Sequence, residues 1–187
     1  MSSLLQIEDA PSPGGKGFAL WALGFRPLYL GAGLFAALSI AAWAASFAGL
    51  VPTGAAPLRD PLWHAHEMIF GFAFAVIVGF LFTAVRNWTG QPTPTGATLA
   101  GIVALWVAAR ILLFSPWSWA AAAADGAFAL AAAWGIGRPI LRARNTRNAF
   151  FVAVMLAFGA ANVAFHLAMA GTLDFPVRRF KIGRAHV

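Results

Sequence analysis

Long apolar runs alternate with short polar segments along this chain of 187 residues. A helix rises about 1.5 Å per residue, so about 20 apolar residues cross a hydrocarbon core of about 30 Å. The pattern predicts five spanning helices, at Leu28–Leu50, Pro61–Val85, Thr98–Phe114, Trp119–Leu141 and Ala149–Ala170. The third run is the shortest and needs its flanking residues to reach across. The expected fold class is therefore all-α, a polytopic transmembrane helix bundle.

Composition supports this prediction and excludes a soluble globule. Hydrophobic residues make up 60% of the chain and charged residues only 10%, whereas a soluble domain is about 25% charged. The lipid bilayer is therefore the first expected partner. The net charge of +7 would suggest nucleic acid, but the basic residues lie mainly between the apolar runs and form no stripe. We expect no nucleic-acid partner. The absence of cysteine excludes disulfides and thiolate metal sites.

The basic residues predict the orientation in the membrane. Cytoplasmic loops of membrane proteins carry an excess of lysine and arginine. Before the fifth helix ends, one set of helix flanks holds only Arg59. The opposite set holds Lys16, Arg26, Arg86, Arg138, Arg142, Arg144 and Arg147. The N-terminus is therefore expected to be cytoplasmic, and the first, third and fifth helices should run outward.

These boundaries divide the chain into four segments. Residues 1–27 are predicted to be a cytoplasmic N-terminal segment, residues 28–170 the five-helix transmembrane region, and residues 171–180 the start of a truncated loop. We interpret Lys181–Val187 as an artefact, because AAGATCGGAAGAGCACACGTC, which resembles a widely used sequencing-adapter sequence, translates to this heptapeptide. His186 lies in this tail and therefore carries no functional argument.

Three other histidines lie where the predicted topology brings them to one side of the membrane. Asp60 and Pro61 are typical of a helix start, which places His64 and His66 in the first two turns of the second helix. His166 lies near the end of the fifth helix, at a similar depth. Imidazole is a common ligand of haem iron and copper, and histidine is rare in membrane spans without a role. Alternatively, interfacial histidines contact headgroups or cap a helix.

The spacing of the first two histidines limits how they can act. Residues i and i+2 lie about 200° apart around a helix, so His64 and His66 face nearly opposite directions. Two separate roles, or one ligand and one bystander, are therefore expected. Glu67, which follows directly, is a candidate for supporting a histidine by a hydrogen bond or for carrying protons. It is equally typical of the acidic residues that stabilise a helix N-terminus.

Further polar residues lie inside the apolar runs. Arg110 and Asp125 are about equally far from the turn at Pro116, so the helical hairpin should bring them together as an ion pair. A structural pair is the main interpretation, and a proton or ligand path is the alternative. Asn162 lies one turn before His166 and could orient it or bond a neighbouring helix. Four glycines indicate close helix packing: Gly31, Gly33, Gly71 and Gly79.

Four short motifs follow one another along the chain: Gly24–Pro27 (GFRP), Trp63–Met68 (WHAHEM), Asn87–Gly90 (NWTG) and Asn162–Leu167 (NVAFHL). Together they resemble the NnrS family. The WHAHEM run is the most specific, and its order with the other motifs makes coincidence improbable. The resemblance covers about residues 17–171, which would be roughly the N-terminal half of a family member.

The resemblance implies a multi-pass protein of the bacterial inner membrane that contains haem and copper. Such proteins are associated with denitrification and with resistance to nitric oxide stress. Carried over by motif, His64, His66 and His166 become the candidate haem and metal ligands, and the resemblance does not say which of them binds which metal. It identifies neither a catalytic reaction nor a catalytic residue, and a respiratory electron donor is a possible partner that it leaves unidentified.

Three hypotheses for function follow from these observations. The first is a haem- and copper-binding membrane protein whose metal binds nitric oxide or a related small ligand. The second is a transporter or channel in which Arg110, Asp125 and Glu67 line a polar path. The third is a structural subunit of a respiratory complex.

Overall fold

The protein is described by a computed structural model that covers residues 19–50, 58 and 60–172. The described part of the chain is helical and contains no strand, which confirms the all-α prediction. Residues 1–18 of the predicted N-terminal segment 1–27 and the tail Lys181–Val187, with His186, lie outside the described residues. Of residues 171–180, only Gly171 and Thr172 are described.

Five helical segments cross the bundle, and each follows one of the predicted runs. They are α1 (Phe25–Phe47), the continuous helix Pro61–Thr89, α4 (Gly96–Leu112), α5 (Ser118–Arg142) and α6 (Phe150–Met169). The continuous helix consists of α2 (Pro61–His66), a π-helical segment (Glu67–Ala73) and α3 (Phe74–Thr89). Two single 3₁₀ turns, Leu20–Ala22 and Thr146–Asn148, precede α1 and α6.

Four of the five helices are long and apolar enough to span a bilayer, so the chain is a multi-pass membrane protein. The exception is α4, whose 17 residues rise about 26 Å, less than a hydrocarbon core of about 30 Å. The predicted length of this helix was right, but its position was two residues too far along the chain.

Local chemistry explains where the second helix begins and ends. The Asp60 carboxylate accepts a hydrogen bond from the Leu62 amide at 2.8 Å, and Pro61 occupies the first helical position. Gly90 ends the helix in the left-handed conformation (φ 62°). The helix therefore continues past the predicted end at Val85, because residues 86–89 contain no breaker.

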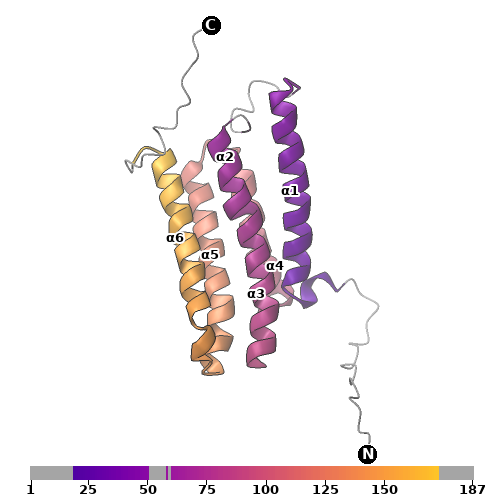
Figure 1. The fold of residues 1–187 in the computed structure, drawn as a ribbon, viewed down its shortest axis with the longest axis vertical. Helices are drawn as coiled ribbons and strands as arrows, with labels where there is room; N and C mark the ends of the chain where they lie inside the picture. Colours follow the sequence, from indigo (N-terminus) through magenta and orange to yellow (C-terminus); the bar gives the residue numbers. More distant parts are fainter. Residues whose placement is uncertain (1–18, 51–57, 59, 173–187) are drawn as a thin grey trace, which may run out of the picture.

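Successive helices run antiparallel, which places the start of α2 and the end of α6 at the same end of the bundle (Figure 1). The ends of α3 and α5 and the start of α1 lie at the opposite end. The helices α3 and α5 pack against each other, α1 packs on α3, and α4 and α6 pack on α5.

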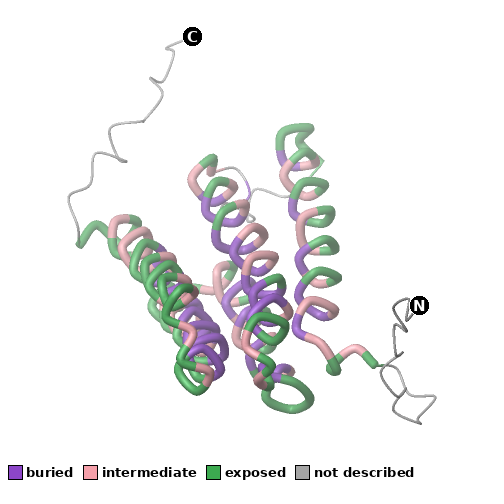
Figure 2. The backbone as a smooth tube through the Cα atoms, turned by 60° about the horizontal axis from the view of Figure 1, so that its bottom comes forward, coloured by how far each residue is buried: buried purple, intermediate pink, exposed green. Residues whose placement is uncertain are grey.

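The α2–α3 helix and α5 carry most of the buried residues, whereas α1 and α6 are exposed over much of their surface (Figure 2). In the most apolar stretch of each helix, 56% of residues are buried in the α2–α3 helix and in α5, but only 17% in α1 and α6. The side chains of Phe74, Phe82 and Phe128 fill the centre. Exposed apolar residues such as Leu34 and Leu38 on α1 suit a lipid environment.

Glycines allow close approach at three of the helix contacts. A Cβ on Gly79 would lie 3.1 Å from the Leu28 side chain of α1, and one on Gly31 would lie 3.1 Å from the Trp106 ring of α4. Gly71 is packed still more closely. The packing prediction was wrong for Gly33, because no described atom lies within 4 Å of a Cβ built there.

Candidate metal centre

The candidate site lies at the junction between α2 and the π-helical segment. His66 is the last residue of α2, and Glu67 begins the π segment. Side chains of adjacent residues diverge in a regular α-helix, yet here the His66 Nδ1 lies 2.8 Å from the Glu67 Oε1. The meeting of these two side chains coincides with the change from α to π winding. Single π turns inside α-helices are frequent at functional sites.

His66 is held between two oxygen atoms from different helices. Its side chain is 2% exposed, and its Nε2 lies 3.0 Å from the Oδ1 of Asn162 on α6. Both ring nitrogens therefore face an oxygen. A neutral imidazole that donates its Nδ1–H to Glu67 keeps a lone pair on Nε2, the nitrogen that a metal ion would bind.

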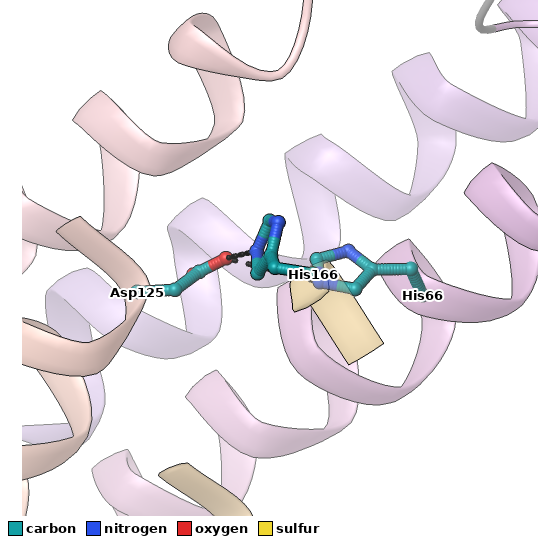
Figure 3. A group of neighbouring side chains, drawn as sticks. All are labelled: His66, Asp125 and His166. Atoms are coloured by element: carbon teal, nitrogen blue, oxygen red, sulfur yellow. Dashed lines mark hydrogen bonds and ion pairs between the residues drawn. The ribbon is translucent and has the colours of Figure 1, made fainter. Parts of the chain in front are cut away.

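Asp125 joins the two histidines that the topology brings together (Figure 3). This carboxylate of α5 is 1% exposed, and its Oδ2 accepts a hydrogen bond from the Nε2 of His166 at 3.1 Å. The same oxygen lies 3.8 Å from the Nε2 of His66. The ring centroids of the two histidines are 4.9 Å apart, with their planes at 71°.

Arg110 of α4 holds two carboxylates at once. Its guanidinium forms an ion pair with Asp125 and a second one with Glu67, where Nη1 lies 3.2 Å from Oε2. The spacing around Pro116 thus predicted the Arg110–Asp125 pair correctly, but it gave no sign of the second carboxylate. All three side chains are at least 94% buried, so the mutual attraction offsets the cost of removing each charge from water.

The cluster as a whole lacks one positive charge. It contains the Glu67 and Asp125 carboxylates and the Arg110 guanidinium, so with neutral imidazoles the net charge is −1. A buried uncompensated charge is costly. A proton or a monovalent cation between the histidines and Asp125 would make the cluster neutral.

The donor atoms fit a metal ion. One ligand atom from each of His66, Asp125 and His166 lies within 4.8 Å of the other two. Zinc-like ions bind such ligands at about 2.0–2.2 Å, which places neighbouring ligand atoms about 3–4 Å apart. Two imidazoles and one carboxylate are a donor set that suits copper, zinc or iron. The Glu67 carboxylate would fix the His66 ring through Nδ1, as hydrogen-bonded partners of metal ligands commonly do.

The same two histidines do not fit as the axial ligands of one haem. Axial ligands stand on opposite faces of the macrocycle with iron between them. Here the Nε2 atoms of His66 and His166 both lie within 3.8 Å of one oxygen of Asp125. A porphyrin ring cannot pass between two imidazoles that share a carboxylate oxygen.

His64 is separated from this cluster, as the angle between positions i and i+2 predicts. Its ring stacks on Trp43 of α1, with centroids 4.3 Å apart and planes at 12°. The similar depth predicted for the three histidines therefore does not bring all three into one cluster. The structure brings together His66 and His166 and leaves His64 on another face of α2.

The structure selects between alternatives for two other residues. Asn162 bonds His66 on the neighbouring helix and not His166, so the second of its two predicted roles is the observed one. Asp125 forms the predicted pair with Arg110, and it also contacts His166, which neither of its predicted roles included. The position of Asp125 near the start of α5 and of His166 near the end of α6 could have indicated this contact, because antiparallel neighbours place such residues at the same depth.

A cavity of about 290 Å³ adjoins the histidines at this end of the bundle. His66 and His166 line it together with Trp63, Phe165 and Met169, while Asp60 and Ser118 supply polar groups. Most of the lining side chains are apolar, which suits a small uncharged ligand. A small ligand in this cavity would therefore lie beside both imidazoles.

Trp106 of α4 anchors the π segment, and sequence reasoning did not single it out. Its Nε1 donates a hydrogen bond to the Gly71 carbonyl at 2.8 Å in the buried interior. Trp106→Phe should lower the free energy of unfolding by about 2 kcal/mol, because the hydrogen bond is lost and the smaller phenyl ring leaves a cavity in the buried interior. Chemical denaturation in detergent measures this change. Trp119→Phe, at a ring that is 75% exposed, is the control and should leave stability unchanged.

The fold and the site define the class of this protein: a polytopic α-helical membrane protein with a buried cluster of histidines, carboxylates and one arginine. A family model described as NnrS protein matches residues 19–184. The chain therefore belongs to the NnrS family. No match was found among curated proteins or among solved structures.

Proposed function

We propose that this chain is a copper-binding protein of the bacterial inner membrane that acts in nitric oxide metabolism or in tolerance of nitrosative stress. The observation that carries the proposal is the buried cluster of His66, His166 and Asp125, which has metal-ligating donors and lacks one positive charge. Membership of the NnrS family supports the link to copper and nitric oxide.

Each residue of the cluster would have a separate task. His66, His166 and Asp125 would hold the ion, and Glu67 would fix the His66 ring through Nδ1. Arg110 would hold both carboxylates in place. When bound, copper supplies a centre that binds nitric oxide directly. The adjoining cavity would admit a small uncharged ligand beside both imidazoles.

Haem binding is part of this proposal only because the chain belongs to the NnrS family. The described histidine pair does not fit one haem, and His64, which stacks on Trp43, stands apart from it. His64 is the described histidine left to bind haem, and no step of the proposed function depends on it. Reduced-minus-oxidised absorption spectra of the wild type and of His64→Ala test haem binding by His64 separately from copper binding.

The geometry favours metal binding over the transport hypothesis. A polar path for an ion or proton needs side chains that face a continuous passage. Arg110, Asp125 and Glu67 are instead paired with one another and buried. Loss of transport in Asp125→Asn with unchanged metal content would favour the transporter. The copurification of stoichiometric partners with a metal-free chain would favour a structural subunit.

Elemental analysis of the purified full chain in detergent tests the proposal. The wild type is expected to bind about one copper per chain, and His66→Ala and His166→Ala should lose it, because each removes one of three ligands. His64→Ala is the matched control and should keep its copper. Nitric oxide should change the spectrum of the copper-loaded wild type and of His64→Ala only. A folded wild type that takes up no copper, or equal loss in all three variants, would refute the proposal.

A further inference from the structure

A second cavity, lined mainly by polar side chains, lies at the end of the bundle opposite the histidines. Its volume is about 220 Å³, and it lies between the loop that joins α3 to α4 and the last turns of α5. Arg138 and Arg142 of α5 line one side, and Thr93, Thr95 and Thr98 line the other. Neither the metal site nor the proposed function uses these residues.

The charge at this end is entirely positive among the described residues. The described acids, Asp60, Glu67 and Asp125, belong to the half of the bundle that holds the histidines. The described basic residues at the cavity end are Arg26, Arg86, Arg138, Arg142, Arg144 and Arg147. Neither Arg138 nor Arg142 forms an ion pair within the described part of the chain. Two arginines one helical turn apart therefore face the cavity without a counter-charge.

Both arginines are exposed, and one of them contacts an aromatic ring. The guanidinium of Arg138 lies over the Trp134 ring, 5.2 Å from its centroid. Such a cation–π contact restricts the side chain and leaves the N–H groups of the guanidinium free to donate. Arginine in this state suits the planar, two-point recognition of phosphate oxygens.

The opposite wall supplies uncharged donors. The Thr93 side chain is 7% exposed, lines the cavity, and makes no hydrogen bond to another described residue. The helix α4 begins at this wall, and its N-cap residue Thr95 makes no side-chain capping bond. The first amides of α4 therefore have no partner within the helix and point toward the cavity end. The Thr93 hydroxyl and the amides at the start of α4 can both donate to an oxygen-rich anion in the cavity.

We propose that this cavity is a binding site for a phosphate group, held by Arg138 and Arg142 and by the hydroxyl of Thr93. The phosphate can come from two sources, the headgroup of an anionic lipid or free inorganic phosphate. The basic residues predict that this end is cytoplasmic, where basic pockets between transmembrane helices bind anionic headgroups. The site is independent of the metal centre, which lies at the other end of the bundle.

Binding to the purified full chain in detergent tests the proposal with two probes. Isothermal titration measures inorganic phosphate, and native mass spectrometry measures retention of phosphatidylglycerol from mixed micelles, with phosphatidylcholine as the comparison lipid. Arg138→Gln and Arg142→Gln should each weaken binding by about tenfold, because each removes a charge-assisted hydrogen bond. Raising the ionic strength from about 0.1 M to about 1 M should weaken it further, because the screening length falls from about 10 Å to about 3 Å.

Arg147→Gln is the matched control, since Arg147 is exposed at the same end but does not line the cavity. It should bind both probes as the wild type does. Retention of phosphatidylglycerol alone identifies a lipid headgroup site, and binding of inorganic phosphate identifies a site open to the free anion. The proposal is overturned if the wild type binds neither probe, or if Arg147→Gln weakens binding as much as the cavity variants.

Discussion

Arg110→Gln is expected to lower the free energy of unfolding by about 3–5 kcal/mol, the cost of removing one partner from a buried ion pair. The guanidinium is the shared counter-charge of Glu67 and Asp125, which are each 1% exposed. Without it, two carboxylates remain buried close to each other. Chemical denaturation of the protein in detergent, followed by tryptophan fluorescence or circular dichroism, measures the loss.

Two further variants test whether the loss of stability comes from the buried ion pairs or from the removal of any arginine. Arg86→Gln, at an exposed arginine near the end of α3, should change stability by less than about 0.5 kcal/mol. Adding Asp125→Asn to Arg110→Gln should recover part of the loss, because the double variant buries one unpaired carboxylate fewer. If Arg110→Gln were as stable as Arg86→Gln, the ion pairs would not stabilise the bundle.

Gly71→Val is expected to cost about 3 kcal/mol and to abolish copper binding. A Cβ at this position would lie 2.6 Å from the Arg110 Nη1, 2.7 Å from the Glu67 Oε2 and 2.8 Å from the Phe35 ring. These contacts are too short, and Arg110 and Glu67 can move away only by breaking their ion pair. Overpacking of this kind costs about 1–3 kcal/mol. Because the ion pair is also broken, the cost of Gly71→Val should lie at the upper end of this range. Unfolding in denaturant and copper content measure the two effects.

Gly33→Val provides the same chemical change at an open position. No described atom lies within 4 Å of a Cβ built on Gly33, which also lies in the middle of a long helix. Valine has a higher helix propensity than glycine, so stability should stay the same or rise by a few tenths of a kcal/mol. A comparable loss in both variants would indicate that valine disturbs helix insertion and not the cluster.

The helices themselves could be predicted from the sequence because their causes are local. The apolar runs marked each crossing, and Asp60 with Pro61 marked the start of the second helix to the residue. The Arg110–Asp125 pair was also predictable, since both residues lie a similar distance from one tight turn. In each case the information lies within a single helix or a single hairpin.

The arrangement of the cluster could not be predicted in the same way. Two contacts depend on how α5 and α6 are rotated about their own axes: that of Asp125 with His166 and that of Asn162 with His66. This rotation follows from the packing of many side chains, such as Gly159 against Ala129, where an added Cβ would lie 2.7 Å from its neighbour. The contact between Glu67 and His66 depends on the π winding, for which the sequence carries no simple mark.

The π segment accommodates one extra residue in the second helix. A single π turn contains one residue more than the α-helix would use over the same length. Deleting one residue between Glu67 and Ala73 would therefore restore α winding and leave α2 and α3 in their present alignment. His66 would still face Asp125, but the residue after it would diverge from the imidazole as in a regular α-helix. One inserted residue thus changes the surroundings of His66 without rotating the rest of the helix.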